Sequence, residues 1–532
     1  MGVSPQNEKA MKKIFRKLNL AALVIVGAMA VGCTGALEEI IPNTPEETTP
    51  GTPEKTQQQP ESKTVTLTTT ISIGTETKAL NAAGEKTFAV GEKVALVYKN
   101  TGGTTVKVES TALTAGDITN EGRNAKFSFE VTAPDKEQDV TYIYPAAMAK
   151  SNGTVNYDAL AMQDGTLETI SSNLDLATYT AAWVDGTSLP SGVLENQLTI
   201  GEFTVKESAG STDITSSVTR LTIKNGSDIY TVTPSSLSTI WVIMKPVTTG
   251  DITIYAAKGK ELYKKTVSGK TLAAGSIYPV NVTTTLVTGA VSGLFRIGDN
   301  LVYFSQGNLR AIYNYSGSSW SWAFAANQWS YVGNAEGNTA INGNGTVSST
   351  KNVTVDLFGW VGASSTWTGV AQYGISNSTT NSGYGNNSKD TLKSDWGNTI
   401  GSGWRTPSID EIQGVFNNHT YGMATVNGIH GVILLPYNTT VAGFNTSHNF
   451  WSNNSYSSAE WTTLEAAGAV FLPATGYRYG SSVYEVGNYG YYWSSSLYST
   501  NNASQYYLRQ DLVRYDSYTY RYEGHAVRLI GE

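Results

Sequence analysis

Carboxylates and histidines are the residues of this sequence that could support hydrolysis or bind a metal ion. The histidines are His419, His430, His448 and His525, and none stands in the H-E-x-x-H pair by which metalloproteases bind zinc. Asp356, Asp395 and Glu465 could include a pair of glycosidase carboxylates, but no spacing places two of them in one site. Glu411 and Glu460 are better explained as helix caps. We therefore predict no catalytic residue, no metal site and no cofactor, with a glycan hydrolase as the weakest alternative.

Cys33 is the only cysteine among the 532 residues, and it follows a targeting segment. Basic residues from Lys12 to Lys17 precede an apolar run at 20–29, which is too short for a membrane-spanning helix of about 20 residues. The preceding tripeptide, Ala30-Val31-Gly32, resembles the lipobox of bacterial lipoproteins, in which the thiol is acylated and the chain is cut just before it. The resemblance implies a signal peptide at 1–32, with Met11 as an alternative start, and a lipid anchor at Cys33 in the outer membrane.

Composition excludes several other kinds of protein. A single cysteine leaves no disulfide within the chain, no thiolate zinc site and no cysteine catalysis. The net charge of −7 includes no basic stripe, so we predict no nucleic-acid partner. Residues 33–63 are rich in Pro, Thr and Glu and have too little apolar surface to offset the entropy of ordering. We expect them to form a semi-extended linker that lifts the folded part off the membrane.

Alternating apolar residues indicate strands from residue 64 onward, so the fold class is mainly β. The strongest strand patterns lie at 65–73, 94–98, 126–131, 140–144, 198–205, 218–223, 240–244, 252–256 and 277–282. Turn signals such as Gly102-Gly103 and Asn225-Gly226 separate many of them. Residues 64–287 are therefore predicted to form two β-sandwich modules with a break near 165–195.

Four fragments of this region, at 88–96, 142–145, 218–223 and 272–280, resemble in order and spacing the fimbrillin-like proteins of Bacteroidales. That resemblance implies two transthyretin-like sandwiches, export as a lipoprotein, and assembly into pili by strand exchange with other pilus subunits. It also implies removal of the lipidated leader after a basic residue near the first strand. Lys78 is the residue that we expect to be cleaved.

After a connector at 288–293, the composition changes for residues 294–532. Ten of the 12 tryptophans lie between Trp320 and Trp493, and no lysine follows Lys393. Ser408 and Glu411 have capping-box spacing, and so do Ser457 and Glu460, so each pair predicts a short helix. With strands predicted at 431–435 and 469–472, this is an α+β domain.

The same domain contains fragments at 301–309, 356–360, 403–407, 468–478, 492–495 and 524–529. In this order they resemble the major paralogous domain first described in Fibrobacter succinogenes, which has a C-type-lectin-like fold. The calcium-binding motifs Glu-Pro-Asn and Trp-Asn-Asp do not occur here, so calcium-dependent sugar binding by that route is not predicted. Trp367 and Trp451, in polar loops, are expected to be the most exposed tryptophans.

Some proteins of this fold are diversified by retroelements, and residues 479–528 resemble such a variable region. Their side chains are largely those that mutated AAC codons encode. The predicted variable, ligand-binding positions are Tyr498, Ser499, Asn501, Asn502, Ser504, Tyr506, Arg509, Asp511, Arg514, Tyr515, Asp516, Tyr518, Tyr520, Tyr522 and His525. The predicted scaffold residues are Trp493, Ser494, Ser495, Ala503, Leu508, Gly524, Val527, Arg528 and Leu529. Tyr, Ser and Asn also serve antibody loops, where they combine large contacts with adaptable hydrogen bonds.

Together these features predict a cell-surface adhesin, the tip subunit of a fimbrillin-type pilus. Its partners would be other pilus subunits, the outer membrane through the lipid, and a protein or glycan ligand on another cell. Two alternatives remain open: a membrane-tethered glycan-binding lipoprotein outside any pilus, and the hydrolase.

Overall fold

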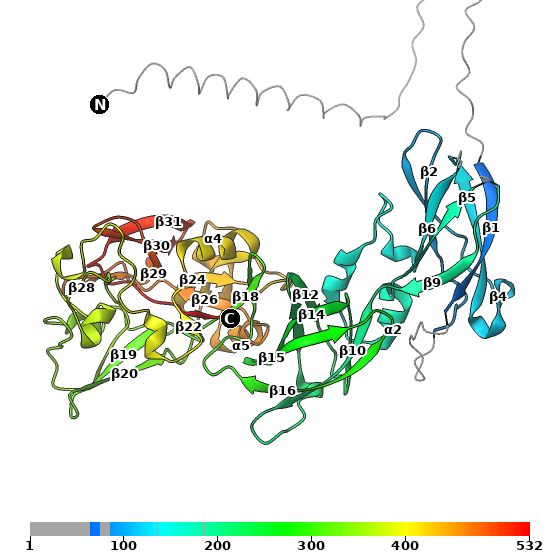
Figure 1. Cartoon of the computed structure of the whole chain (residues 1–532). Coiled ribbons are helices and arrows are strands. Elements are labelled where there is room, and N and C mark those ends of the chain that lie inside the picture. The colour runs from blue at the N-terminus through cyan, green and yellow to red at the C-terminus, as the bar shows by residue number, and fades with distance from the viewer. Residues whose placement is uncertain (1–63, 75–85, 133, 136, 185–186) are drawn as a thin grey trace, which may run out of the picture. The chain divides into compact units, whose positions relative to one another are not determined.

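The computed structural model describes residues 64–74, 86–132, 134–135, 137–184 and 187–532, coloured from blue to red in Figure 1. These residues belong to one compact unit, Ser62–Glu532. The signal peptide, the lipidation site Cys33, the linker and the cleavage site Lys78 lie outside the described residues. Among the helices that are described, none is long and apolar enough to cross a membrane.

The first sandwich module contains eight strands in the order β3-β2-β6-β8-β9-β1-β5-β4. Its strands are β1 (Thr64–Ile73), β2 (Ala95–Lys99), β3 (Thr105–Glu109), β4 (Ile118–Thr119), β5 (Asn124–Thr132), β6 (Gln138–Tyr144), β8 (Ala177–Trp183) and β9 (Gly192–Asn196). The short helices beside them are η1 (Ala115–Asp117), η2 (Asn120–Gly122) and η3 (Ala146–Met148). Alternation along β1 and β5 buries Ile71, Phe127 and Phe129 in a core that also contains Tyr142 and Trp183.

The second module also contains eight strands, in the order β13-β10-β16-β15-β14-β11-β12-β7. These are β7 (Met162–Gln163), β10 (Thr199–Glu207), β11 (Arg220–Asn225), β12 (Asp228–Val232), β13 (Ile240–Met244), β14 (Val247–Lys258), β15 (Glu261–Leu272) and β16 (Ile277–Leu286). Its short helices are η4 (Tyr157–Ala161), α2 (Leu167–Thr169), η5 (Ile170–Leu174) and η6 (Thr215–Ser217). β10 and β16 run parallel, with Ile200 opposite Ile277 and Val205 opposite Val282.

The two modules are interleaved rather than separated by one break near 165–195. β7 pairs with β12 of the second module, yet β8 and β9, which follow β7 in the chain, belong to the first. The chain therefore enters the second module, returns to the first, and leaves it again after Asn196. The expected fold class is confirmed, because the chain is mainly β and an α+β domain follows the two modules.

The C-terminal domain combines several small sheets with two helices of more than two turns. Its strands are β17 (Phe295–Ile297), β18 (Asn300–Phe304), β19 (Leu309–Asn314), β20 (Ser319–Phe324), β21 (Val353–Val355), β22 (Trp404–Arg405), β23 (Tyr421–Val426), β24 (Ile429–Leu434), β25 (Ser455–Tyr456), β26 (Val470–Pro473), β27 (Tyr477–Tyr479), β28 (Ser482–Tyr484), β29 (Tyr489–Leu497), β30 (Asn502–Arg509), β31 (Leu512–Tyr520) and β32 (Ile530–Gly531). Its helices are α3 (Glu336–Thr339), η7 (Gly369–Tyr373), η8 (Asn381–Gly383), η9 (Trp396–Thr399), α4 (Ile409–Asn418), η10 (Trp451–Asn453) and α5 (Ser458–Ala466).

Both predicted capping boxes are present in this domain. At the start of α4, the Ser408 hydroxyl accepts a bond from the Glu411 N–H at 3.2 Å, and the Glu411 carboxylate accepts one from the Ser408 N–H at 2.8 Å. Ser457 and Glu460 make the same pair of bonds before α5. This helix ends at Ala466, and Gly468, with a φ of +89°, follows its C-cap residue Ala467. α4 buries Ile412, Val415 and Phe416 against the sheet of β29, β30 and β31, and so supports the site described next.

Candidate ligand-binding face

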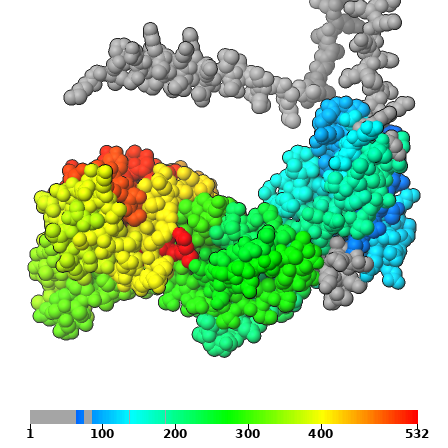
Figure 2. Space-filling model, in the orientation of Figure 1, coloured from blue at the N-terminus to red at the C-terminus, as the bar shows by residue number. Residues whose placement is uncertain are grey.

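The site lies on the three-stranded sheet in which β30 is flanked by β29 and β31 (Figure 1). Residues directly opposite each other on paired strands project to the same side of a sheet. The register gives three rows on one side: Tyr489 with Arg509 and Leu512, Tyr491 with Tyr507 and Arg514, and Trp493 with Gln505 and Ser517. A bulge in β31 lies between the second and third rows, so the residues of β31 on this side are Arg514 and Ser517, three positions apart instead of two. In Figure 2 the orange-to-red segment that includes β30 and β31 reaches the surface.

Five tyrosines, Tyr477, Tyr484, Tyr489, Tyr491 and Tyr507, form the group that we call the tyrosine cluster. The Tyr491 ring centre lies 5.7 Å from that of Tyr507, 5.6 Å from that of Tyr489 and 5.4 Å from that of Tyr477. The Tyr484 ring lies 5.5 Å from Tyr477, so the hairpin of β27 and β28 extends the cluster beyond the sheet. Burial raises the pKa of Tyr477 and of Tyr491, so both phenols remain neutral hydrogen-bond donors at physiological pH.

More tyrosines lie beside the cluster. Tyr479 follows Tyr477 by two residues on β27, so both project from the same face of the hairpin. Its ring lies 5.7 Å from that of Tyr522, which in turn stacks on Tyr520 at 5.0 Å. Tyr498 and Tyr518 stack at 3.7 Å while remaining 56% and 46% exposed. Exposed rings of this kind supply large contacts at a low cost in side-chain entropy.

Two arginines at this end of the sheet are neutralised by neighbouring aspartates. Arg509 Nε lies 2.8 Å from the Asp511 carboxylate, and Arg514 Nε lies 2.8 Å from that of Asp516. A bond to Tyr489 and the charge of Asp511 raise the pKa of Arg509, and bonds to Asp516 and Tyr507 raise that of Arg514. The face is therefore aromatic, and its charges occur in compensated pairs.

Twelve of the predicted variable positions reach the surface to some degree. Tyr498, Asn501, Asp511, Arg514, Asp516, Tyr518 and Tyr520 are exposed, and Ser499, Asn502, Arg509, Tyr515 and Tyr522 are partly exposed. Tyr515 faces α4, where its ring stacks on Phe416 at 5.9 Å and its hydroxyl donates to the Asn417 side chain at 2.7 Å. Its main contacts are thus within the domain.

Three predicted positions need correction, because Ser504, Tyr506 and His525 are buried. Tyr506 projects from β30 into the core, where its ring stacks on Tyr492 at 5.1 Å. His525 is fully buried, with its ring 4.3 Å from that of Trp493. Ser504 is 6% exposed on the central strand. None of the three side chains contacts solvent enough to bind a ligand directly.

The tyrosine cluster was missed in the sequence, because its members were not among the predicted variable positions. The spacing of Tyr489 and Tyr491, two residues apart in a strand, is the signal that could have indicated a shared face. Of the predicted scaffold residues, Ser495 is partly exposed, and Trp493, Ser494, Ala503, Leu508, Gly524, Val527, Arg528 and Leu529 are buried.

The carboxylates considered for hydrolysis serve three separate structural contacts. Asp356 is buried, which raises its pKa, and accepts a bond from the Asn338 amide at 2.7 Å. Asp395 caps η9 and accepts bonds from the N–H and hydroxyl of Thr406. Glu465 pairs with Lys260 and accepts a bond from Gln328. In the part of the chain that the structure describes, no three His, Cys, Asp or Glu residues are placed to hold a metal ion.

Two tryptophans expected to be exposed are packed instead. Trp451 is 7% exposed and lies parallel to the His430 ring at 5.4 Å. Trp367 is half-buried, and its ring meets that of Tyr384 edge-on at 4.5 Å.

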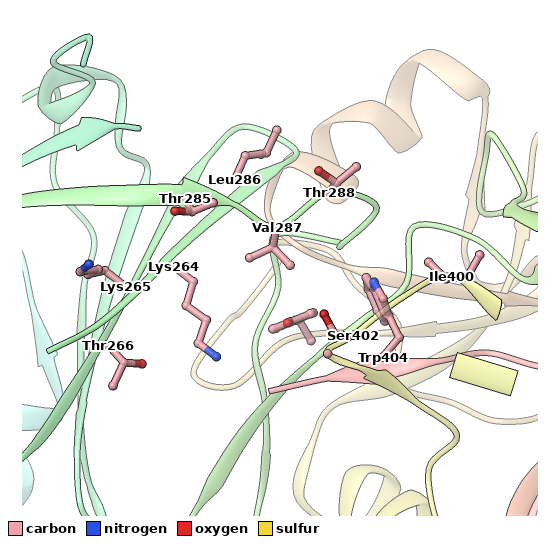
Figure 3. A pocket seen from close by; sticks show the side chains of 12 residues that line it. Lys264, Lys265, Thr266, Thr285, Leu286, Val287, Thr288, Ile400, Ser402 and Trp404 are labelled. Atoms are coloured by element: carbon pink, nitrogen blue, oxygen red, sulfur yellow. The ribbon is translucent and has the colours of Figure 1, made fainter. Parts of the chain in front are cut away.

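A cleft of about 570 Å³ lies away from the tyrosines, where β15 and the end of β16 approach the segment 400–404. Figure 3 shows Lys264 and Lys265 on one side of it and Ile400 and Trp404 on the other. Lys264 already donates a hydrogen bond to the main-chain oxygen of Glu532. Of the two lysines that line the cleft, Lys264 is therefore already hydrogen-bonded within the protein.

Comparison with known proteins gives a local match and remote structural neighbours. A family model described as a domain of unknown function, DUF8237, matches residues 446–530, which contain α5 and the three strands of the face. None of the curated proteins matches the chain. A fimbrial assembly protein from Parabacteroides distasonis is similar at 8% identity, over 49% of this chain and 100% of that protein, with a TM-score of 0.26. A fimbrial protein from Bacteroides ovatus is similar at 11% identity, over 89% and 100%, with a TM-score of 0.20. Because these values are low, function is inferred from the chain's own residues.

Proposed function

We propose that this protein is a cell-surface adhesin whose C-terminal domain binds a ligand on another cell through the tyrosine cluster and its neighbours. The observation that carries the proposal is the row of Tyr491, Tyr507 and Arg514 across three strands, continued by Tyr477 and Tyr489. Tyr and Arg are the residues most often found at the energetic centres of protein interfaces. Their rigid sheet keeps the cost of ordering them on binding low.

We propose further that the adhesin is a pilus tip subunit that joins other subunits by strand exchange. Strand addition requires a segment that is free to pair with a neighbour's sheet. In this chain β16, the last strand of the second module, already pairs with β10 and β15, and β17 of the C-terminal domain begins at Phe295. A subunit whose last sandwich strand is used internally suits the end of a pilus. The lipid on Cys33 and cleavage after Lys78 belong to the same proposal.

Adherence of bacteria that produce the full chain tests the binding role. Replacing Tyr489, Tyr491 and Tyr507 together by alanine should abolish adherence, since central tyrosines commonly contribute about 2 kcal/mol or more each. Tyr315 is 47% exposed and lies outside the cluster, so Tyr315→Ala is the matched control. Undiminished adherence of the triple variant, at normal surface level, would show that the cluster is not the binding site.

Cell fractionation distinguishes a pilus tip subunit from a membrane-tethered lipoprotein outside any pilus. The tip model expects the protein in sheared pili, with an N-terminus at Ala79. If the protein occurs only as acylated lipoprotein in outer-membrane fractions, it is a tethered glycan-binding lipoprotein instead. The hydrolase alternative rests on Asp356, Asp395 and Glu465, which contact different partners, and lost turnover of a glycan on substituting all three would support it.

A further inference from the structure

A group of polar side chains lies next to the tyrosine cluster on the same side of the sheet. Its members, Gln505, Ser517, Thr519, Glu523 and His525, are called the polar group below. Gln505 and Ser517 occupy the row after Tyr491 and Tyr507, and the Gln505 amide lies 3.4 Å from the Ser517 hydroxyl. Thr519 donates to the Glu523 carboxylate at 2.8 Å. Successive rows on one face of a strand pair are two residues, or about 7 Å, apart.

The inner members of the polar group have unused hydrogen-bonding capacity. Gln505 is 5% exposed, and its side-chain oxygen has no hydrogen-bond partner among the described residues. His525 is fully buried, and neither ring nitrogen makes a hydrogen bond to a described residue, although Nε2 lies 3.5 Å from the Glu523 carboxylate. Buried polar atoms are nearly always paired, so each such atom calls for an explanation such as a bound water or ligand.

The outer members are accessible. Ser517, Thr519 and Glu523 are partly exposed, so they form the layer that a ligand would meet, with Gln505 and His525 behind them. Burial works against the charge of Glu523, but His525 and the Thr519 hydroxyl outweigh it and lower its pKa. Glu523 is thus ionised at neutral pH, where it accepts hydrogen bonds and repels anions.

We propose that the polar group binds the hydroxyl groups of an uncharged sugar residue whose apolar face rests on Tyr491 or Tyr507. A sugar ring has a C–H face and a rim of hydroxyls, which matches an aromatic row beside a row of amide, hydroxyl and carboxylate groups. Ser517, Thr519 and Glu523 contact the hydroxyls directly, and a water molecule held between these side chains and the sugar reaches the unpaired atoms of Gln505 and His525 behind them. This inference rests on the proposed function and names the ligand class of that same face.

Binding of the full chain to an immobilised panel of oligosaccharides tests the proposal. The panel contains neutral glycans of galactose, mannose, glucose and N-acetylhexosamines, with sialylated and sulfated counterparts. The chain should bind at least one neutral glycan. Its variant with Ser517→Ala, Thr519→Val and Glu523→Gln should bind it at least tenfold more weakly, because each tenfold corresponds to about 1.4 kcal/mol, one hydrogen bond to a charged group.

The matched control carries Thr446→Val and Ser447→Ala, which make the same substitutions at two exposed positions of another loop. It should bind as the unaltered chain does, and thermal unfolding of both variants checks that they fold. The proposal is overturned if no neutral glycan binds at millimolar concentration, if the triple variant binds unchanged, or if the charged counterparts bind more tightly.

Adherence to treated cells distinguishes this proposal from the adhesin itself. Periodate cleaves vicinal diols of sugars, whereas proteases remove protein ligands. Adherence that depends on the tyrosine cluster and survives periodate but not protease would leave the adhesin standing and reject the sugar. If the chain binds a neutral glycan but the bacteria that produce it adhere to no cell, the sugar site is supported and the adhesin role is rejected.

Discussion

Arg478 offers a stringent test of how the binding face is supported. It lies between Tyr477 and Tyr479 on β27, and its side chain is fully buried. Its guanidinium donates to the main-chain oxygens of Ser376 at 2.6 Å and Gly480 at 2.9 Å, and it reaches that of Leu357 at 3.3 Å. One side chain therefore fastens the tyrosine-bearing hairpin to two loops.

The substitution Arg478→Met keeps most of the length of the side chain and removes every donor. Each buried carbonyl that loses its partner costs about 1–3 kcal/mol, so the two short bonds represent about 2–6 kcal/mol. Part of this loss in free energy is offset, because the buried guanidinium of Arg478 is bonded to uncharged oxygens and Arg478→Met removes the cost of burying its charge. We expect a net loss of about 3 kcal/mol in the free energy of unfolding of the C-terminal domain.

Urea unfolding followed by tryptophan fluorescence measures this loss. Ten of the 12 tryptophans lie between Trp320 and Trp493, so the signal reports mainly on the C-terminal domain. Arg514→Met is the control, because Arg514 is exposed and its pair with Asp516 lies at the surface, so its midpoint should stay nearly unchanged. A loss below about 1 kcal/mol for Arg478→Met would refute the reasoning, since it would mean that the carbonyls find other partners at little cost.

Three further predictions follow from buried or capping groups. Lys86 and Asp175 form a buried pair at 3.0 Å, so Asp175→Ala should leave an uncompensated charge and destabilise the first module by about 3–5 kcal/mol in calorimetry. Ser408→Ala should remove the N-cap of α4 and cost about 1 kcal/mol in urea unfolding, whereas Ser408→Asp should cost less. Burial lowers the pKa of His525 below the unfolded value of 6.5, so its contribution to stability is present above pH 6.5 and is lost as the pH falls below it. The melting temperature should accordingly drop between pH 7.5 and 5.5, and His525→Phe should make that drop smaller.

Much of the framework could be predicted from local patterns. β1 and β13 lie where alternation placed them, because a strand with one buried face must repeat every two residues. The helices α4 and α5 begin at the two predicted capping boxes, since Ser and Glu three residues apart satisfy each other's backbone donors. Interleaving of the sandwiches could not be predicted this way. β7 is two residues long, and its pairing with β12 depends on residues about 70 positions away.

On the binding face, residue type alone does not predict which side chains are exposed. Tyr506 and Tyr507 are adjacent and chemically identical, yet Tyr506 packs on Tyr492 in the core while Tyr507 belongs to the tyrosine cluster. Only the side of the sheet to which each projects separates them, and that side depends on the register of β29, β30 and the bulged β31. If the region is diversified, the same geometry requires that variation at Tyr507, Arg514 and Ser517 alter ligand contacts and that variation at Tyr506 alter packing. Tolerance to substitution should therefore differ between these two neighbours on β30, with Tyr507 accepting polar replacements that unfold the domain when placed at Tyr506.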